Sequence, residues 1–376
     1  MKLTWSLYLG KIAGIKLFVH WTFWILVVWI FIMHYQASNS VSDGLIGVLF
    51  IFALFLCVVL HELGHSLTAR RFDIQTKNIT LLPIGGMASL EMMPEKPRQE
   101  LLVAAAGPLV NVVIAFILYV YLKSTGGMYT LSELAEGDAA AVGITMSGSD
   151  FLFNLYVVNI ALVLFNLIPA FPMDGGRMLR ALLAYRMDRG KATMIAARIG
   201  QFLAIAFVFF GFFNNFWLVF IGLFIFLGAG GEAAYEATRS ALGNYRVKDV
   251  LITKYSWITP DSSLGHAVQL LLDSQEQAFL VGEDNIVTGV LTRNNIIKGL
   301  DQFGKSGHVR DVMLKEFPKL DIETELKEVY RKMTTEGFEF APVYQNGHIA
   351  GVLDRENISE FIMVESANKT NQMRFS

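Results

Sequence analysis

An uncharged stretch at residues 45–60 runs directly into the sequence HELGH at residues 61–65. Together these residues predict a membrane-spanning helix that ends near the motif. Residues four apart in a helix project from one face, so the imidazoles of His61 and His65 can both reach one Zn²⁺. Glu62 is then placed as a general base toward water. Ionisable residues at membrane depth are costly and are candidates for function, whereas the alternative is a chance motif whose histidines cap the helix end.

The composition indicates that the first part of the chain lies in a lipid bilayer. Hydrophobic residues make up 53% of the chain and charged residues 17%, against about 25% charged residues in soluble proteins. The long apolar runs lie in residues 1–235, and a soluble composition begins at about residue 245. The net charge of −2 gives no indication of nucleic-acid binding. The single cysteine, Cys57, excludes an intramolecular disulfide and a cysteine-based zinc site.

The apolar runs predict about six transmembrane helices. The expected spans are residues 17–35, 45–67, 101–122, 151–167, 195–213 and 216–229. The clusters of lysine and arginine fall on one side of these spans, whereas the connections on the other side, 36–43, 124–150 and 214–215, contain neither. Positive residues mark the cytoplasmic side of a membrane protein. Both termini are therefore expected to be cytoplasmic, with the HELGH motif and Asp174 toward the same side.

Two further features interrupt the apolar part of the chain. Pro83 and the pair Gly85-Gly86 predict a turn between two short strands within residues 76–93. This segment is either an ordinary loop or an exposed strand edge able to pair with an extended substrate. Asn111 lies in an apolar helix, where it either hydrogen-bonds a neighbouring helix or has a functional role.

Asp174 is a candidate for a third metal ligand. It follows Pro169 and Pro172, which forbid a regular helix, and it precedes two glycines that allow a tight backbone. A carboxylate on such a broken, apolar-flanked segment suits a zinc ligand. The alternative is that Asp174 caps a helix that begins at about Gly176. Because the fourth span ends near Asp174 on the side where the second span ends in HELGH, the two sets of candidate ligands converge at one depth.

The C-terminal part of the chain contains an internal repeat with an offset of 62 residues. VKDV at 247–250 matches VRDV at 309–312. GVLTRNNI at 289–296 matches GVLDRENI at 351–358. Two matches that agree on one offset indicate a duplicated unit. Each unit is predicted to run strand, helix, strand, turn, strand and helix.

With HELGH, GPLVN at 107–111 and NLIPAFPMDGG at 166–176, the chain resembles the site-2 protease family of intramembrane zinc metalloproteases. The C-terminal repeat resembles a pair of CBS (cystathionine-β-synthase) domains. The first resemblance implies one Zn²⁺ per chain, held by His61, His65 and Asp174, with Glu62 as the catalytic base. It also implies that residues at four positions help hold the substrate, namely Gly85, Gly86, Asn111 and Asn166.

The expected fold is an α-helical polytopic membrane protein followed by a soluble α/β tandem CBS domain. The expected boundaries are a transmembrane protease domain at 1–235, a linker at 236–246 and a tandem CBS domain at 247–376, with repeats at 247–304 and 309–365. CBS pairs often bind adenine nucleotides through a threonine or serine and a following aspartate. Thr292 is present here, but Asn295 stands where aspartate is usual, and Asp354 replaces the threonine in the second repeat. The resemblance thus implies at most one weakly bound adenine nucleotide, at Thr292 and Asn295.

These features predict an intramembrane endopeptidase that cleaves a transmembrane segment of a membrane-anchored protein, with the CBS pair regulating activity or substrate access. The expected partners are the lipid bilayer, a membrane-spanning substrate and, through the CBS domains, a second copy of the chain. Two alternatives stay open: a CBS-gated transporter or channel with His and Asp on a cation path, and an inactive scaffold. Three metal-ligand side chains with a general base argue against both, since a transport path must release its ion and a scaffold needs no base.

Overall fold

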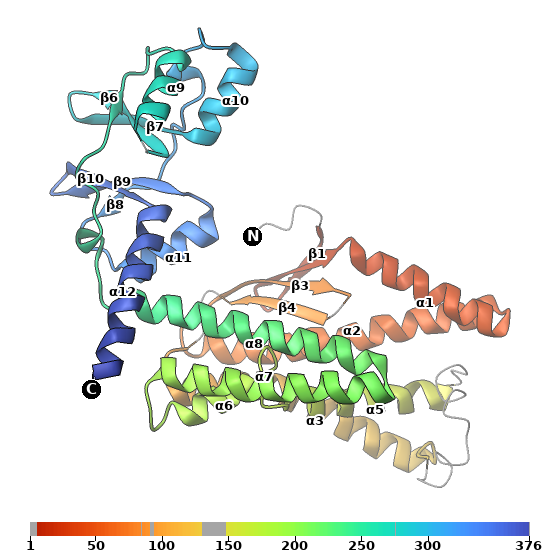
Figure 1. Ribbon diagram of the computed structural model, residues 1–376. Coiled ribbons are helices and arrows are strands. Elements are labelled where there is room, and N and C mark those ends of the chain that lie inside the picture. The colour runs from red at the N-terminus through yellow and green to blue at the C-terminus, as the bar shows by residue number, and fades with distance from the viewer. Residues whose placement is uncertain (1–5, 84, 91–93, 130–147, 275, 376) are drawn as a thin grey trace. The chain divides into compact units, whose positions relative to one another are not determined.

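The computed structural model describes residues 6–83, 85–90, 94–129, 148–274 and 276–375 (Figure 1). The chain divides into two units, Lys2–Glu236 and Ala237–Ser376. The first contains a helix bundle with a four-stranded sheet, and the second contains two three-stranded sheets with their helices. The predicted fold class, a helical membrane protein followed by an α/β tandem, is confirmed.

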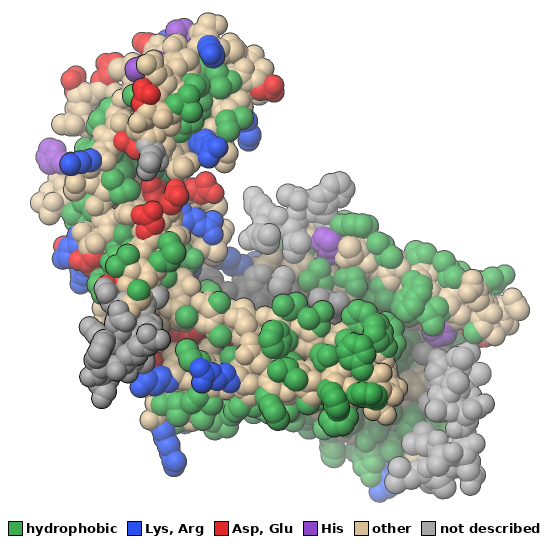
Figure 2. Space-filling view, in the orientation of Figure 1, with side chains coloured by type: hydrophobic (Ala, Val, Ile, Leu, Met, Phe, Trp, Pro, Cys, Tyr) green, Lys and Arg blue, Asp and Glu red, His purple; other side chains and the backbone are tan. Residues whose placement is uncertain are grey.

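Four helices in the described residues are long and apolar enough to span a membrane: α2 (Val41–Arg70), α3 (Pro97–Thr125), α7 (Arg189–Asn214) and α8 (Phe216–Leu242). Helices α1 (Thr22–Ser38) and α5 (Gly148–Asn166) are also apolar but shorter. These six helices correspond in order to the six expected spans. Their outward-facing side chains are largely hydrophobic, as Figure 2 shows for the face in view. Such a surface is suited to hydrocarbon, so this part of the chain is a membrane protein.

The predicted first span is wrong at its start. Residues up to His20 form strand β2 (Ile15–His20), and the helix begins only at Thr22. Strand β1 (Ser6–Ile12) pairs antiparallel with β2, which makes a hairpin of the preceding segment. A short apolar strand that leads straight into an apolar helix cannot be told from the helix by hydrophobicity, because both are continuous apolar runs.

A four-stranded sheet packs against α1 and α2. Strand β3 (Thr76–Leu82) pairs parallel with β2, and β4 (Gly85–Leu90) pairs antiparallel with β3. The strand order is β1-β2-β3-β4, so β4 lies at an edge. The predicted turn between two strands in residues 76–93 is therefore confirmed for its described part. The shared core consists of Ile15, Val19, Phe23, Phe55, Val59, Leu63, Ile79 and Leu81.

Glycines bring three backbone segments close together around the HELGH motif. A Cβ on Gly64 of α2 would lie 2.8 Å from the Ala106 carbonyl oxygen of α3, so only glycine allows this helix contact. The short helix α6 (Asp174–Leu183) follows α5 after the proline-containing segment. A Cβ on its residue Gly175 would lie 2.3 Å from the Ile168 carbonyl oxygen. The start of α6 is thus packed against the segment that precedes it.

The second unit consists of two similar halves. The first half contains β5 (Trp257–Ile258), α9 (Leu264–Asp273), β6 (Ala278–Glu283), β7 (Ile286–Thr292) and α10 (Arg293–Phe303). The second half contains β8 (Leu320–Asp321), α11 (Leu326–Glu336), β9 (Phe340–Gln345), β10 (His348–Asp354) and α12 (Arg355–Phe375). In each half the middle strand pairs parallel with the first strand and antiparallel with the last. This is the predicted order of strands and helices in each repeat.

The segment that opens each sequence repeat packs into the other half. Val247, in the short 3₁₀ helix Val247–Asp249, lies in the core of the second half. Val309, in the equivalent 3₁₀ helix Val309–Asp311, lies in the core of the first half. The structural halves therefore differ from the sequence repeats in their first segment.

Two equivalent hydrogen bonds fix this exchange. Asn295 Nδ2 donates to the Val312 carbonyl oxygen at 2.9 Å. Asn357 Nδ2 donates to the Val250 carbonyl oxygen at 2.5 Å. Asn357 lies 62 positions after Asn295, and Val312 lies 62 positions after Val250. The two halves are therefore related by an approximate internal symmetry.

Candidate metal centre and active site

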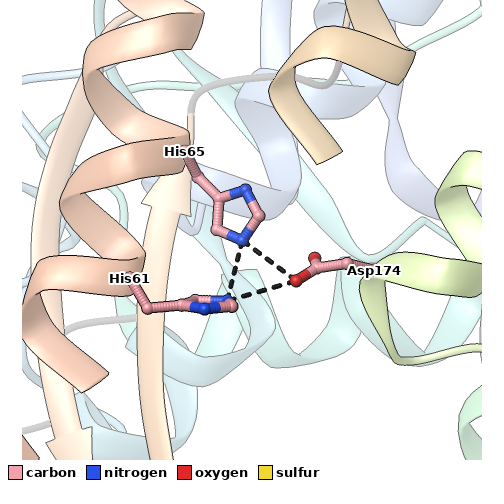
Figure 3. A group of neighbouring side chains, drawn as sticks. All are labelled: His61, His65 and Asp174. Atoms are coloured by element: carbon pink, nitrogen blue, oxygen red, sulfur yellow. Dashed lines mark hydrogen bonds and ion pairs between the residues drawn. The ribbon is translucent and has the colours of Figure 1, made fainter. Parts of the chain in front are cut away.

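Three side chains from two distant parts of the sequence meet at one point (Figure 3). His61 and His65 project from one face of α2, and Asp174 is the first residue of α6. The two histidine Nε2 atoms are 3.0 Å apart, and each lies 3.1 Å from Asp174 Oδ2. All three residues are buried, with at most 8% of each exposed. Within the part of the chain that the structure describes, this is the one group of three or more potential metal ligands.

In the neutral form of each imidazole, hydrogen bonds on the far side leave the facing nitrogen without a proton. His65 Nδ1 lies 2.7 Å from the Val103 carbonyl oxygen, and His61 Nδ1 lies 2.6 Å from Asn111 Oδ1. Both oxygens only accept hydrogen bonds, so each Nδ1 carries the proton of the neutral ring and each Nε2 keeps its lone pair. Two nitrogen lone pairs and a carboxylate oxygen thus converge, which is repulsive unless a cation lies between them.

Gly107 of α3 keeps the point of convergence clear. A Cβ at this position would lie 2.1 Å from His65 Nε2 and 2.6 Å from His61 Nε2. Any side chain here would therefore occupy the space on which the ligand atoms converge. Two imidazoles and a carboxylate match the donor set of catalytic zinc sites, which use three protein ligands and keep one position open. The residues present thus fit Zn²⁺.

Glu62 lies beside this centre and outside the converging group. Its side chain packs against the backbone of β4, where a Cβ on Gly86 would be 2.9 Å from Glu62 Cγ and 3.4 Å from Glu62 Oε1. Among the described strands, β4 has β3 as its single neighbour. A carboxylate thus lies next to a strand edge, where an extended peptide can add as a further strand.

The alternative that Asp174 caps α6 is not supported. The N-cap residue is Met173, and Asp174 begins the helix itself. Its Oδ2 faces the two histidines, while its Oδ1 lies 3.8 Å from Arg177 Nη1. A carboxylate in the first turn is also favoured by the partial positive charge of the helix N-terminus.

A buried ion network holds α6 in place. Arg180 of α6 is fully buried and donates to Glu100 of α3 at 2.6 and 2.8 Å and to Glu232 of α8 at 2.5 Å. Arg189, at the start of α7, donates to Glu100 at 2.7 Å and to Glu236 at 3.3 Å. Four helices are thereby tied together near the residue that completes the centre. From the sequence, these arginines were interpreted only as positive charges that mark one side of the membrane. Their pairing with Glu100 could not be predicted, because Glu100 lies 80 and 89 positions away from them.

Two of the predicted substrate-positioning residues lie at the centre. Gly86 contacts Glu62, as described above. Asn111 is fully buried and bonds both His61 and Asn159 of α5, the latter at 2.8 Å, so the helix–helix hydrogen bond considered for it is present. Gly107 and Asn159, which the sequence did not single out as site residues, complete these contacts. Gly107 could have been found from the sequence, because it is the first residue of the GPLVN motif. Asn159 belongs to none of the motifs identified in the sequence.

The other two predicted substrate-positioning residues lie at the end of α5 and at the start of β4. Asn166 ends α5 and donates to the Leu162 carbonyl oxygen at 2.9 Å. Gly85 begins β4 with φ of +134°, a backbone conformation that favours glycine, and a Cβ there would meet open space.

In the second unit, the predicted nucleotide-binding residues are engaged in local structure. Thr292 is the N-cap of α10, and its hydroxyl donates to the Asn295 side chain. The equivalent Asp354 accepts from the Asn357 backbone N–H at 2.7 Å. The polar groups expected to hold a nucleotide therefore already have protein partners.

The sequence profile of peptidase family M50 matches residues 49–207, and the CBS domain profile matches residues 247–302 and 309–364. The zinc metalloprotease MJ0392 of Methanocaldococcus jannaschii is 34% identical over 357 residues, which cover 95% of this chain and 96% of that protein. The chain belongs to peptidase family M50. It is a zinc metalloprotease with two CBS domains. The solved site-2 protease from M. jannaschii is 37% identical and covers 61% of this chain and 95% of that one, with a TM-score of 0.44.

The M50 match includes every residue of the converging group as well as Glu62, Gly86, Gly107 and Asn159. The zinc that this family uses has a fitting donor set in the described part of the chain, on α2 and α6. The CBS matches begin at the two 3₁₀ helices that exchange between the halves.

Proposed function

We propose that this M50 protease cleaves a transmembrane segment of another membrane protein, with one Zn²⁺ held by His61, His65 and Asp174. The observation that carries the assignment is the convergence of three lone-pair-bearing atoms on a space that Gly107 leaves clear. The group belongs to a bundle whose helices are apolar enough to cross a bilayer, which supports a peptide bond cut within or near the membrane.

Glu62 is the general base in this proposal. Zinc, when bound, supplies Lewis-acid activation of water and of the scissile carbonyl. Glu62 accepts a proton from the attacking water at its carboxylate and later gives it to the leaving amine. Its contact with Gly86 keeps this carboxylate beside the strand edge, where the peptide bond is presented.

The edge of β4 is the proposed binding site for the unwound part of the substrate. A helical peptide bond is shielded by its own hydrogen bonds, so the substrate helix must open before hydrolysis. An edge strand offers unpaired backbone groups that replace the lost helical hydrogen bonds. Gly85 and Gly86 allow a close backbone approach at the start of this edge, and Asn166 is assigned to hold the substrate from the end of α5.

Replacing Asp174 with alanine is expected to weaken zinc binding and abolish cleavage while the protein still inserts in the membrane. Removing a zinc ligand should lower the zinc affinity by more than the roughly 10–100-fold that follows removal of a ligand's hydrogen-bond partner. Zinc per chain, measured on the purified protein under chelator competition, reports the first effect. Cleavage of single-span membrane proteins in proteoliposomes reports the second.

The matched control is Asp188→Ala. Asp188 caps α7 by accepting from the Gly190 backbone N–H at 2.9 Å, so it is a carboxylate with a capping role alone. This variant should keep its zinc. If Asp174→Ala also retains stoichiometric zinc and cleavage, the third ligand lies elsewhere.

We also propose that both termini and the metal centre lie toward the cytoplasm, because lysine and arginine gather on that side of the spans. Of the loop 124–150, residues 130–147 lie outside the described residues, so the test uses its first part. In a Cys57→Ala background, Ser124→Cys should react with an impermeant thiol reagent on intact cells. Leu272→Cys, at a position 78% exposed in the second unit, should react only after permeabilisation. Reaction of Leu272→Cys alone on intact cells would invert the orientation.

The CBS pair is proposed to regulate substrate access and to join two copies of the chain. A ligand can regulate the protease through the CBS pair only if it binds one conformation of the pair more tightly than another. We expect at most one adenine nucleotide per chain, bound weakly, with Thr292→Ala reducing the binding through loss of the hydroxyl. Calorimetry of the full-length protein with ATP, ADP and AMP tests this, with Thr288→Ala in the same strand, β7, as the control. Absence of heat at millimolar nucleotide would leave the pair as an assembly or recruitment module.

A further inference from the structure

A chain of buried amides extends from the metal centre to α5. Asn111 Nδ2 donates to Asn159 Oδ1 at 2.8 Å, and Asn159 Nδ2 donates to the Leu155 carbonyl oxygen at 2.8 Å. The same nitrogen also donates to Cys57 Sγ on α2 at 3.5 Å. Both asparagines are 0% exposed, so water does not compete for these groups. The chain therefore links α2, α3 and α5, and it ends on His61.

The Leu155 carbonyl oxygen, at the α5 end of this series of hydrogen bonds, determines the direction of all the others. A backbone carbonyl only accepts, so Asn159 must turn its NH₂ group toward Leu155 and its oxygen toward Asn111. Asn111 must then turn its NH₂ group toward Asn159 and its oxygen toward His61. Because an amide oxygen also only accepts, His61 Nδ1 must donate, and Nε2 is left with a free lone pair.

The two histidines differ in how their tautomers are fixed. His65 Nδ1 bonds the Val103 backbone carbonyl directly, and that oxygen can only accept a hydrogen bond. His61 Nδ1 bonds a side-chain amide, which could rotate by half a turn and present its NH₂ group instead. That rotation would require an unprotonated Nδ1 and would move the proton to Nε2, where the metal binds. The partner of Asn111 that opposes the rotation is Asn159.

We propose that Asn159 is a positioning residue of the metal centre, which acts through Asn111 to hold His61 in the tautomer whose Nε2 is free for zinc. The hydrogen bonds of Asn159 go to Asn111, Cys57 and Leu155, so its effect on His61 passes through the Asn111 amide. This inference rests on the proposed role of His61 as a zinc ligand.

The variant Asn159→Leu tests the proposal on the purified full-length protein. Leucine has a similar size but offers neither an acceptor nor a donor, so Asn111 loses the partner that sets its orientation. Zinc affinity, measured by chelator competition, should fall about 10–100-fold, the usual loss when a partner of a metal-ligating histidine is disturbed. Asn159→Asp retains an oxygen that accepts from Asn111, and its zinc affinity should remain close to that of the wild type.

The double variant Asn111→Asp/Asn159→Leu separates orientation from packing. A carboxylate at position 111 accepts through either oxygen, so it holds His61 Nδ1 as the donor without help from position 159. The double variant should therefore recover most of the zinc affinity that Asn159→Leu loses. The control Asn214→Leu removes an amide that makes the same kind of bond, to the carbonyl oxygen of Phe210 at 3.1 Å, and should leave zinc affinity unchanged.

Each result bears on the proposal. Zinc affinity at the wild-type level in Asn159→Leu overturns it, and so does a double variant that binds zinc no better than Asn159→Leu. If Asn159→Leu does not fold, Asn159→Ser replaces it, since the shorter hydroxyl cannot reach Asn111, and the same loss is expected. A wild-type chain without stoichiometric zinc would overturn the proposed function, whereas normal wild-type zinc with an unaffected Asn159→Leu overturns this inference alone.

Discussion

Replacing Glu62 with glutamine is expected to reduce cleavage about 10²–10⁴-fold, the range that a positioned general base contributes. Glutamine preserves the size of the side chain and its packing against Gly86, but it does not accept a proton from the attacking water. Zinc should stay bound, because Glu62 lies outside the three converging side chains. The rate of cleavage of single-span membrane proteins in proteoliposomes, together with zinc per chain in the same preparation, measures both effects.

The control for this experiment is Asp43→Asn. Asp43 lies in the first turn of α2, at the opposite end from the HELGH motif, and the exchange makes the same change from carboxylate to amide. Cleavage should be unchanged in this variant. Loss of zinc in Glu62→Gln would identify Glu62 as a ligand, and full activity would assign the base to another residue.

The part of the centre that could be predicted from the sequence is the part that local geometry determines. His61 and His65 lie four residues apart on one helix, so their relative position follows from the helix itself. Asp174 could be added because prolines and glycines interrupt an apolar run, which is a local signal as well. The structure brings these three residues together, and it rejects the alternative that Asp174 is a helix cap.

What the sequence did not reveal depends on contacts between residues far apart in the chain. Asn159 lies in an apolar helix, and nothing nearby in the sequence distinguishes it from a residue that packs against lipid. Glu100 and Arg180 bond across 80 positions, so neither residue predicts the other. The exchange of 3₁₀ helices between the CBS halves is hidden for a similar reason. A repeat indicates which segments are equivalent but not which copies pack together.

A single methyl group at position 107 is expected to remove zinc and cleavage together. The Cβ of Gly107→Ala would lie 2.1 Å from His65 Nε2 and 2.6 Å from His61 Nε2, far inside van der Waals contact. Either the imidazoles turn away, and His65 gives up its bond to the Val103 carbonyl oxygen, or α3 moves away from α2. Both responses separate the ligand atoms, so zinc affinity should fall at least about 100-fold. Chelator competition and the proteoliposome assay measure the two losses.

The control Gly231→Ala makes the same exchange in α8, where a Cβ would meet no atom within 4 Å. It gives the effect of alanine on helix propensity and insertion without a clash, and it should keep zinc and activity at wild-type levels. If Gly107→Ala binds zinc as tightly as Gly231→Ala does, the metal does not lie where the two imidazoles and Asp174 converge. The ligand assignment would then fail, because a methyl carbon and a metal ion cannot share the space in front of the two Nε2 atoms.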